Sequence, residues 1–333
     1  MTISIAANKI LSFYTDAQKL RRGEMIIPRM VSLWLTTGCD LDCIYCWCHK
    51  ENRQFKLADT SSVKQMIDEI AALGVESLEL GGGGEPTLHP DCFEVAEYAQ
   101  VRGLKVGLLT NGFRFDMKRL SCFQYVRIGL DAYNADLYHK IKGGSPGRFE
   151  ETIKVIHAML RERGKAARPR IGIKYLLCRD NWRYVEDMAA LARDLHVDYC
   201  QFKPVHSCDV VLSGDFPGIV EREILRVGTK EPGFVYGTAL PCIKTVRCFL
   251  SPTHAVITPD GDALVCCFFN RPDKVIGNVF REGFAEIWHS KRHWYAIDAI
   301  PEEECGKYDC RWHYYNAEMA AVLDGGKYDL SFI

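Results

Sequence analysis

The chain lacks an excess of charge of either sign. Its 333 residues include 42 Lys and Arg against 43 Asp and Glu, which gives a formal net charge of −1. A protein dedicated to nucleic-acid binding usually carries a basic excess or a basic stripe. The sequence therefore predicts no nucleic-acid partner.

Long apolar runs are also absent. No run reaches the roughly 18 residues that a membrane-spanning helix needs. The amino-terminal segment has no basic stretch followed by an apolar stretch and a small-residue cleavage site, so it does not resemble a signal peptide. Hydrophobic residues make up 47% of the chain and charged residues 26%, which is typical of a globular protein. We expect no membrane partner and a cytoplasmic location.

Cysteine, in contrast, is plentiful, with 15 residues in the chain. A disulfide framework is typical of short secreted domains, and this chain is neither short nor marked for secretion. The clustered thiols therefore predict metal binding. Four isolated cysteines lie in apolar periodic segments and are expected to be small buried hydrophobes, namely Cys92, Cys122, Cys178 and Cys200.

Strand-like and helix-like segments alternate between residues 30 and 206. This alternation is typical of parallel βαβ units. The predicted units are too few to close an eight-stranded barrel, so we expect an α/β fold, a partial (β/α)6 TIM-like barrel, preceded by a helical extension over residues 1–29. The strands are expected at Met30–Thr36, Ser77–Leu80, Lys105–Thr110, Tyr125–Leu130, Ile171–Leu177 and Asp198–Lys203.

The pattern changes after residue 206. Residues 207–241 are expected to form a linker region, loop-rich at His206–Gly218 and Lys230–Pro241 with a helical patch between them. Residues 242–333 are expected to form a small α+β domain, with a hairpin around the turn Pro259-Asp260-Gly261-Asp262, a helix, and a cysteine-bearing tail. The hairpin strands are expected at Ala255–Thr258 and Ala263–Cys266, and the helix around Gly283–Ile297.

Three short motifs each follow directly on a predicted strand. C-x3-C-x2-C follows the first strand, GGGGE (residues 81–85) follows the second, and Thr110-Asn111-Gly112 follows the third. Because the carboxyl ends of parallel strands share one edge of the sheet, we expect all three motifs to open onto the same mouth of the barrel.

The cysteine triplet consists of Cys39, Cys43 and Cys46. Three thiolates on one loop can hold three irons of a [4Fe–4S] cluster and leave the fourth iron open to another ligand. A zinc site would need a fourth protein ligand, which Cys48 or His49 could supply. Both alternatives stay open on the spacing alone.

Together with the aromatic Tyr45 directly before the third cysteine, this spacing resembles the signature of the radical S-adenosylmethionine superfamily. The resemblance implies that S-adenosylmethionine chelates the open iron through its amino and carboxylate groups. It also implies reductive cleavage to a 5′-deoxyadenosyl radical, which abstracts a hydrogen atom from the substrate. Gly83, Gly84 and Glu85 match the family's GGE motif, which contacts the methionine amino group.

Softer matches extend the resemblance towards the sixth strand. Asn111 stands in a segment similar to the family's TNG, and Asp131 follows the fourth strand as in the family, although Gly129 replaces a frequent serine. Lys142 stands where an arginine is common, and Lys174 is expected to point to the mouth or to be a snorkelling surface lysine. The cofactor-binding residues so implied are Tyr45, Gly82, Gly83, Gly84, Glu85, Asn111, Asp131, Lys142 and Lys174.

The carboxyl-terminal cysteines carry a second resemblance. Cys248 and Cys266 form C-x12-G-x4-C, which resembles the opening of the SPASM and twitch extensions. The tail adds only Cys305 and Cys310, so the resemblance implies one closed auxiliary [4Fe–4S] cluster held by these four thiolates. A structural zinc ion is the alternative. Cys267 is a candidate hydrogen-atom donor or a buried bystander, and Lys203 is a second candidate catalytic residue.

Enzymes with this truncated extension include dehydrogenases and epimerases of aminocyclitols and sugars. Many peptide maturases carry a recognition module before the barrel, whereas 29 residues precede Met30 here. The sequence therefore predicts oxidation or epimerisation of a small sugar or aminocyclitol substrate, with flavodoxin or ferredoxin as electron donor. The alternatives are a maturase of a ribosomally made peptide and, third, a zinc-stabilised binding module without catalytic activity.

Overall fold

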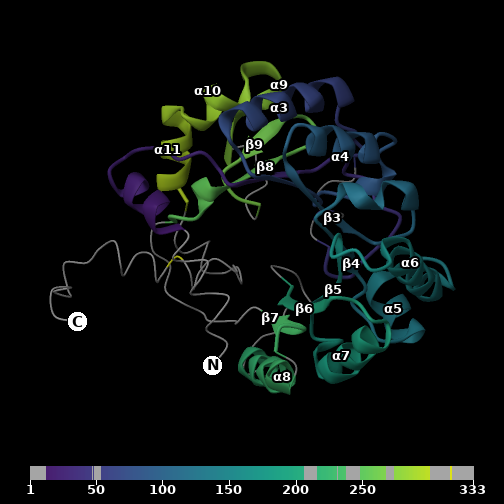
Figure 1. Ribbon diagram of the computed structural model, residues 1–333. Coiled ribbons are helices and arrows are strands. Elements are labelled where there is room, and N and C mark those ends of the chain that lie inside the picture. Colours follow the sequence, from purple (N-terminus) through teal and green to yellow (C-terminus); the bar gives the residue numbers. More distant parts are fainter. Residues whose placement is uncertain are drawn as a thin grey trace.

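The computed structural model describes residues 13–46, 48, 54–205, 216–230, 232–237, 248–267, 274–300 and 316. Their core is a ten-stranded sheet with the order β10-β9-β8-β1-β2-β3-β4-β5-β6-β7. The sheet is strongly curved, and most of the helices line its outer side, as Figure 1 shows. This is the open, partial barrel that the alternating pattern predicts.

Strands β1 to β7 run parallel and pair in chain order, and β8 pairs in parallel with β1 on the other side. Two antiparallel pairings, β8 with β9 and β9 with β10, extend that edge. The strands are β1 Met30–Leu33, β2 Ser77–Leu80, β3 Lys105–Thr110, β4 Tyr125–Gly129, β5 Arg170–Leu177, β6 Tyr199–Pro204, β7 Val235–Gly237, β8 His254–Ile257, β9 Asp262–Leu264 and β10 Val275–Asn278.

The helices cover the convex face because alternate strand residues point to it. In β5, Ile173 and Tyr175 are fully buried in a core that they share with helical residues such as Ile156 and Met188. Their neighbours in the strand face the barrel interior. The helices are α3 Thr60–Leu73, α4 Cys92–Val101, α5 Ala135–Lys142, α6 Arg148–Arg163, α7 Val185–Asp194, α8 Phe216–Lys230, α9 Val279–Glu282, α10 Phe284–Trp288 and α11 Lys291–Asp298.

Two elements differ from the sequence expectation. In the region expected as a linker, α8 is the expected helical patch, whereas β7 was not expected and adds a seventh parallel strand through the pairing of Cys200 with Val235. The helix α5 also went unrecognised between β4 and α6. Both β7, with three residues, and α5, with eight, are too short to show a clear hydrophobic period.

The carboxyl-terminal hairpin forms where it was expected, and it joins the barrel sheet directly. Met30 of β1 pairs with His254 of β8. Glu69 of α3 accepts hydrogen bonds from the backbone nitrogens of Phe284 and Ala285, at 2.7 and 2.8 Å, and so caps α10. The carboxyl-terminal part at residues 248–267 and 274–300, called the auxiliary unit below, is thereby fixed against the start of the barrel.

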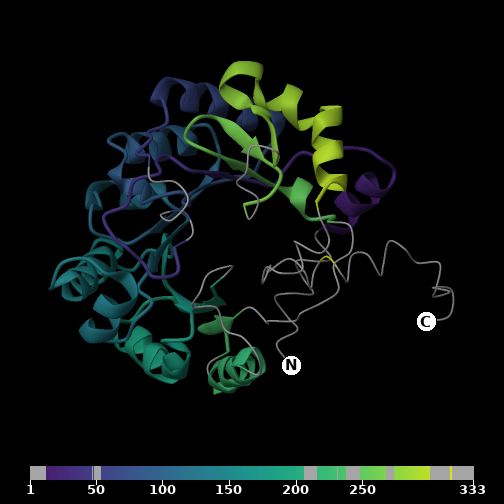
Figure 2. The ribbon, with the colours of Figure 1, turned by 180° about the vertical axis from the view of Figure 1, so that it is seen from behind.

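The helical turns at residues 13–21 pack beside this unit, as Figure 2 shows from behind. Ala17 and Leu20 form a small core with Phe249, and Trp294 of α11 lies against it. In the part of the chain that the structure describes, no helix has the length and apolar character to cross a membrane.

Candidate functional site

The three cysteines of the triplet lie on the loop that follows β1. The backbone nitrogens of Asp42 and Ile44 donate to the carbonyls of Lys142 and Ile141, at 3.1 and 3.0 Å, so the end of α5 holds this loop. Among the described cysteines, the partly exposed ones are the expected ligands Cys39, Cys43, Cys46, Cys248 and Cys266, together with Cys267. The isolated cysteines Cys92, Cys122, Cys178 and Cys200 are buried, as expected.

The protein surroundings alone disfavour thiolates in the triplet. Burial raises the pKa of Cys39 to about 12 and also raises the pKa of Cys43. A coordinating metal reverses this preference, because it binds the deprotonated sulfur. In the described residues, no three His, Cys, Asp or Glu side chains converge on one metal ion. Three thiolate ligands of a [4Fe–4S] cluster bind three different irons, so the loop fits such a cluster without that convergence.

The glycine loop after β2 lies directly on the cysteine loop. The backbone nitrogen of Glu85 donates to the carbonyl of Gly38 at 2.8 Å. A Cβ atom on Gly84 would come within 2.1 Å of the same carbonyl oxygen. Gly82 and Gly83 have φ angles of 94° and 71°, which L-residues with side chains rarely adopt. Glycine is therefore required for the contact between the two loops.

The carboxylate of Glu85 is buried, with 4% exposure, and accepts four hydrogen bonds from the protein. Oε1 accepts from the Thr87 backbone nitrogen and hydroxyl and from the Thr110 hydroxyl, and Oε2 accepts from the Asn111 backbone nitrogen at 2.7 Å. Burial raises the pKa of Glu85, and these hydrogen bonds oppose that rise. The carboxylate thus ties the glycine loop to the end of β3, a role that the motif alone does not reveal.

Asn111 continues this connection back to the cysteine loop. Its side-chain nitrogen donates to Oδ1 of Asp40 at 2.6 Å, and Asp40 follows Cys39 in the chain. The carboxyl ends of β1, β2 and β3 are therefore joined by hydrogen bonds into one polar surface. This is the shared mouth that the order of the three motifs predicts.

A second buried group joins Tyr45, Asp131 and Lys142. Asp131 Oδ2 accepts from the Tyr45 hydroxyl at 2.5 Å and from the Lys142 ammonium at 2.8 Å, and Oδ1 accepts from the Leu176 backbone nitrogen. Burial alone would lower the pKa of Lys142, but the neighbouring Asp131 carboxylate raises it overall. Asp131 and Lys142, both of which were expected to contact the cofactor, thus form an ion pair that supports the cysteine loop.

Asn181 completes this group, and the sequence reasoning missed it. Its side chain is fully buried and donates to the carbonyls of Asp131 and Leu176, at 3.1 and 2.8 Å. Asp131 has a φ angle of 57°, a left-handed conformation that asparagine and aspartate tolerate better than other residues with side chains. No motif marks Asn181, because its partners are identified only by the fold.

The remaining expected residues lie on the concave face or near it. Lys174 of β5 and Lys203 of β6 alternate with core residues and so face the barrel interior. Cys267 packs against a small cluster that contains Trp34, and a Cβ atom on Gly82 would come within 2.2 Å of Trp34 Nε1. Trp34 thus lies between the glycine loop and the auxiliary unit. Cys305 and Cys310 lie outside the described residues.

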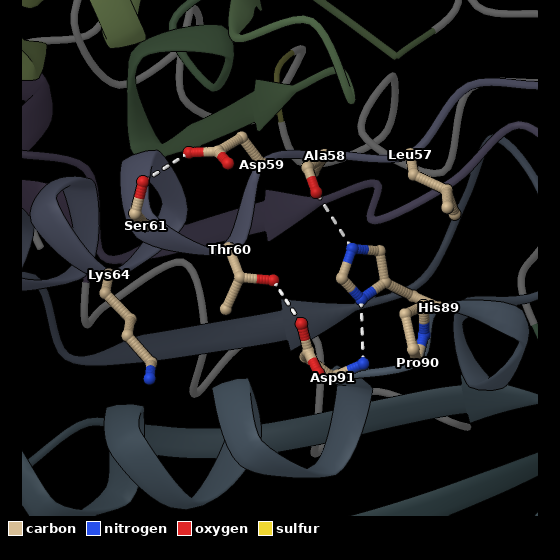
Figure 3. Close-up of a pocket in the computed structure, with 9 residues that line it drawn as sticks. All are labelled: Leu57, Ala58, Asp59, Thr60, Ser61, Lys64, His89, Pro90 and Asp91. Atoms are coloured by element: carbon tan, nitrogen blue, oxygen red, sulfur yellow. Dashed lines mark hydrogen bonds between the residues drawn. The ribbon is translucent and has the colours of Figure 1, made fainter.

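A hollow of about 520 Å3 lies at the start of α3 (Figure 3). Its histidine, His89, is already engaged, because Nε2 lies 2.9 Å from the Ala58 carbonyl and Nδ1 accepts from the Asp91 backbone nitrogen. Thr60 donates to the Asp91 carboxylate at 2.6 Å, and Lys64 pairs with Glu94. None of the expected site residues lines this hollow, and its polar groups stabilise the start of α3.

Comparison with known proteins agrees with the geometry. The family model of the radical SAM superfamily matches residues 35–192, and that of the SPASM iron–sulfur cluster-binding domain matches residues 248–311. The AdoMet-dependent heme synthase of Methanosarcina barkeri is 35% identical over 147 residues, which cover 40% of this chain and 39% of that protein. That match therefore spans less than half of either protein.

Other similarities span both parts of the chain. The mycofactocin maturase MftC of Mycobacterium tuberculosis is 30% identical over 319 residues, covering 88% of this chain and 80% of the maturase. The crystal structure of Streptococcus suis SuiB bound to its precursor peptide SuiA superimposes with a TM-score of 0.67 at 16% identity, covering 91% of this chain and 73% of SuiB. At that identity, the likeness to SuiB concerns the fold.

These similarities overturn one expectation. The prediction of a sugar or aminocyclitol substrate, and of a sugar dehydrogenase or epimerase, is wrong, because relatives that match across both parts are named as maturases or as bacteriocin biosynthesis proteins. The prediction depended on the truncated auxiliary extension and on how little chain precedes the first strand. Neither feature gives information about which groups line the barrel interior, where a substrate must bind.

Proposed function

The chain belongs to the radical S-adenosylmethionine superfamily and carries a SPASM-type iron–sulfur domain, and we propose that it is a maturase of a ribosomally made peptide. The radical SAM domain binds a [4Fe–4S] cluster and S-adenosylmethionine, and the SPASM domain binds auxiliary iron–sulfur clusters. The observation that carries the proposal is the 30% identity to a maturase over 88% of this chain, which includes both domains.

The cysteine loop is proposed to hold the cluster that binds the cofactor. Cys39, Cys43 and Cys46 would be its three protein ligands, and the cluster with its cofactor would supply reductive cleavage and hydrogen-atom abstraction. The glycine loop lies on Gly38, next to Cys39, and its backbone, which carries no side chains here, would leave room for the methionine end of the cofactor. Glu85 holds this backbone in place through its bonds to Thr110 and Asn111.

The auxiliary unit is proposed to hold one closed cluster. Its ligands would be Cys248, Cys266, Cys305 and Cys310, of which the first two lie at the base of the hairpin, before β8 and after β9. Burial raises the pKa of Cys248, so this thiol, like Cys39, favours deprotonation only with a metal bound. Cys267 and Lys203 remain proposed catalytic residues, Cys267 because it packs between the hairpin and Trp34.

The test is anaerobic turnover of the reconstituted full-length protein with S-adenosylmethionine and dithionite. Synthetic precursor peptides and aminocyclitols are offered in parallel, and 5′-deoxyadenosine and the mass of each candidate product are measured. We expect turnover and a mass change with a peptide, and about eight irons per chain from two four-iron clusters. Turnover with an aminocyclitol and with none of the peptides would refute the maturase.

A further inference from the structure

Lys174 has an unusual environment on the concave face of the barrel. Its neighbours in β5, Ile173 and Tyr175, are fully buried on the helix side, so the lysine points to the interior. Within the described residues, its ammonium group makes no hydrogen bond or ion pair. Burial lowers the pKa of this ammonium, although Asp131 opposes the effect.

A second polar group without a partner lies beside it. Gln201 pairs with Lys174 in register, so their side chains project from neighbouring strands about 4.8 Å apart. In the described structure, Gln201 Oε1 is buried without a hydrogen-bond partner. On the other side, Lys174 pairs with Gly129, and the Lys142 ammonium lies 3.4 Å from the position that a Cβ atom on Gly129 would take. Lys174 and Gln201 therefore present two polar side chains without hydrogen-bond partners, next to the ion pair of Lys142 with Asp131.

The charged side chains near Lys174 give its surroundings a net positive charge. Of the two nearby carboxylates, Asp131 is paired with Lys142, and Glu79 accepts hydrogen bonds from the hydroxyls of Ser32 and Tyr125. Arg127, one row deeper on β4, lies over the rings of Tyr125 and Tyr199 and adds positive charge. Lys174 is half-buried, and an ammonium group partly withdrawn from water without an anion costs stability, so the arrangement suits an anion supplied from outside.

We propose that Lys174 and Gln201 bind a carboxylate of the substrate peptide inside the barrel, either an Asp or Glu side chain or the carboxyl terminus. The ammonium donates a charge-assisted hydrogen bond to one carboxylate oxygen, and the Gln201 amide donates to the other. The amide presents its nitrogen to the ligand by rotating about its terminal bond. This proposal rests on the peptide function proposed above and specifies what the peptide must carry.

The methionine carboxylate of the cofactor is a less suitable occupant. It must reach the cysteine loop, and the lysine beside Cys43 is Lys142, which is engaged with Asp131. Lys174 is level with Gly129, two residues before Asp131, and so lies deeper in the barrel. Its charged neighbours include Asp131, Arg127, Lys142 and Glu79.

The experiment uses reconstituted full-length protein with S-adenosylhomocysteine and a synthetic heptapeptide library, each peptide prepared with a free carboxyl terminus and with a terminal amide. Bound peptides are identified by affinity-selection mass spectrometry. We expect the wild type to enrich peptides that carry a carboxylate at one position. Lys174→Met should weaken their retention at least tenfold, and Lys174→Arg should retain part of it. The matched control is Lys154→Met, on the exposed side of α6.

The outcomes separate the proposals. If the wild type enriches no peptide, the maturase function and this site both fail. Enrichment that is independent of carboxylates, or unchanged in Lys174→Met, overturns this site alone. Tenfold weaker S-adenosylmethionine binding in Lys174→Met, measured by calorimetry, with normal peptide retention would assign Lys174 to the cofactor instead.

The melting temperature of the protein without peptide tests whether Lys174 has only a structural role. Because the ammonium is unpaired, Lys174→Met should melt at or above the wild-type temperature, whereas Lys142→Met should melt below it. A lowered melting temperature for Lys174→Met would show that the lysine stabilises the fold and would contradict the proposal.

Discussion

The ammonium of Lys142 lies 2.8 Å from the carboxylate of Asp131, and the two side chains are only 6% and 1% exposed. Tyr45, between the second and third cysteines of the triplet, donates to the same carboxylate. The buried pair thus connects the carboxyl end of β4 and the end of α5 to the loop proposed to hold the cluster. A substitution that weakens the Lys142–Asp131 pair should therefore also displace the cysteine loop.

Breaking this pair is expected to be costly. Asp131→Asn or Lys142→Met leaves the other charge buried without its partner, and each should lower the free energy of unfolding by about 3–5 kcal/mol. Urea unfolding of the holoprotein measures the change. The double variant should lose much less than the sum of the two, and strictly additive losses would show that the pair does not act as a unit.

The three triplet cysteines should be required for iron, whereas Cys48 should not. Cys39→Ala, Cys43→Ala or Cys46→Ala removes one thiolate, so each variant should lose about four irons per chain and all 5′-deoxyadenosine formation. Cys48→Ala is the matched control, because this buried thiol is two residues beyond Cys46. Loss of bound metal in Cys48→Ala, with zinc in the wild type, would support the four-ligand zinc site instead.

Glu85 should affect cofactor affinity by holding the loops. Glu85→Ala leaves the buried Thr110 and Asn111 donors without an acceptor, and a hydrogen bond to a charged group contributes about 1.5–3 kcal/mol. We expect S-adenosylmethionine binding to weaken by about tenfold or more, or about 1.4 kcal/mol per decade, with iron content unchanged. Calorimetry and iron analysis test this. Glu85→Gln, which keeps one acceptor oxygen, should lose less, and equal losses in the two variants would argue against the hydrogen-bond explanation.

The contact between the two loops should tolerate no side chain at Gly84. In Gly84→Ala the new Cβ would come within 2.1 Å of the Gly38 carbonyl oxygen, which is backbone and cannot rotate away. Overpacking of this kind costs about 1–3 kcal/mol, and displacement of the cysteine loop should also reduce iron loading. Gly218→Ala is the control, since its nearest atom is an arginine side-chain nitrogen 3.6 Å away in α8. Normal iron loading in Gly84→Ala would show that the loops can separate without loss of the cluster site.

His293 should make the auxiliary unit sensitive to acid. Burial lowers its pKa from 6.5 to about 4, and its Nδ1 lies 2.8 Å from the Trp288 carbonyl. Because the folded-state pKa is the lower one, the unfolded chain binds the proton first, so stability is complete above pH 6.5 and falls as the pH drops towards 4. The loss should reach about 3 kcal/mol by pH 4. Urea unfolding of wild type and His293→Leu across this range should show a shallower pH dependence in the variant, and parallel curves would rule the effect out.

The features that depend on short spacing could be predicted from the amino-acid sequence. The C-x3-C-x2-C triplet, the glycine loop and the turn at Gly261 are local, because neighbouring residues share a loop in whatever fold contains them. The alternating strands and helices could also be predicted, because apolar residues recur with a period of 2 in a half-buried strand and of 3.6 in an amphipathic helix. These two signals sufficed for the partial barrel and its mouth, whereas the cofactors were implied by the resemblance of the motifs to the radical S-adenosylmethionine superfamily.

The contacts between distant groups became evident only in the folded chain. Glu85 bonds to Thr110 and Asn111, more than twenty residues further along the chain, and this turns an expected cofactor contact into a link between loops. Lys142 and Lys174 look alike in sequence, yet one is neutralised by Asp131 and the other has no carboxylate partner within the described residues. The lining of the barrel depends on the register of neighbouring strands, which no local pattern encodes. For that reason the substrate class could not be derived from spacing or composition.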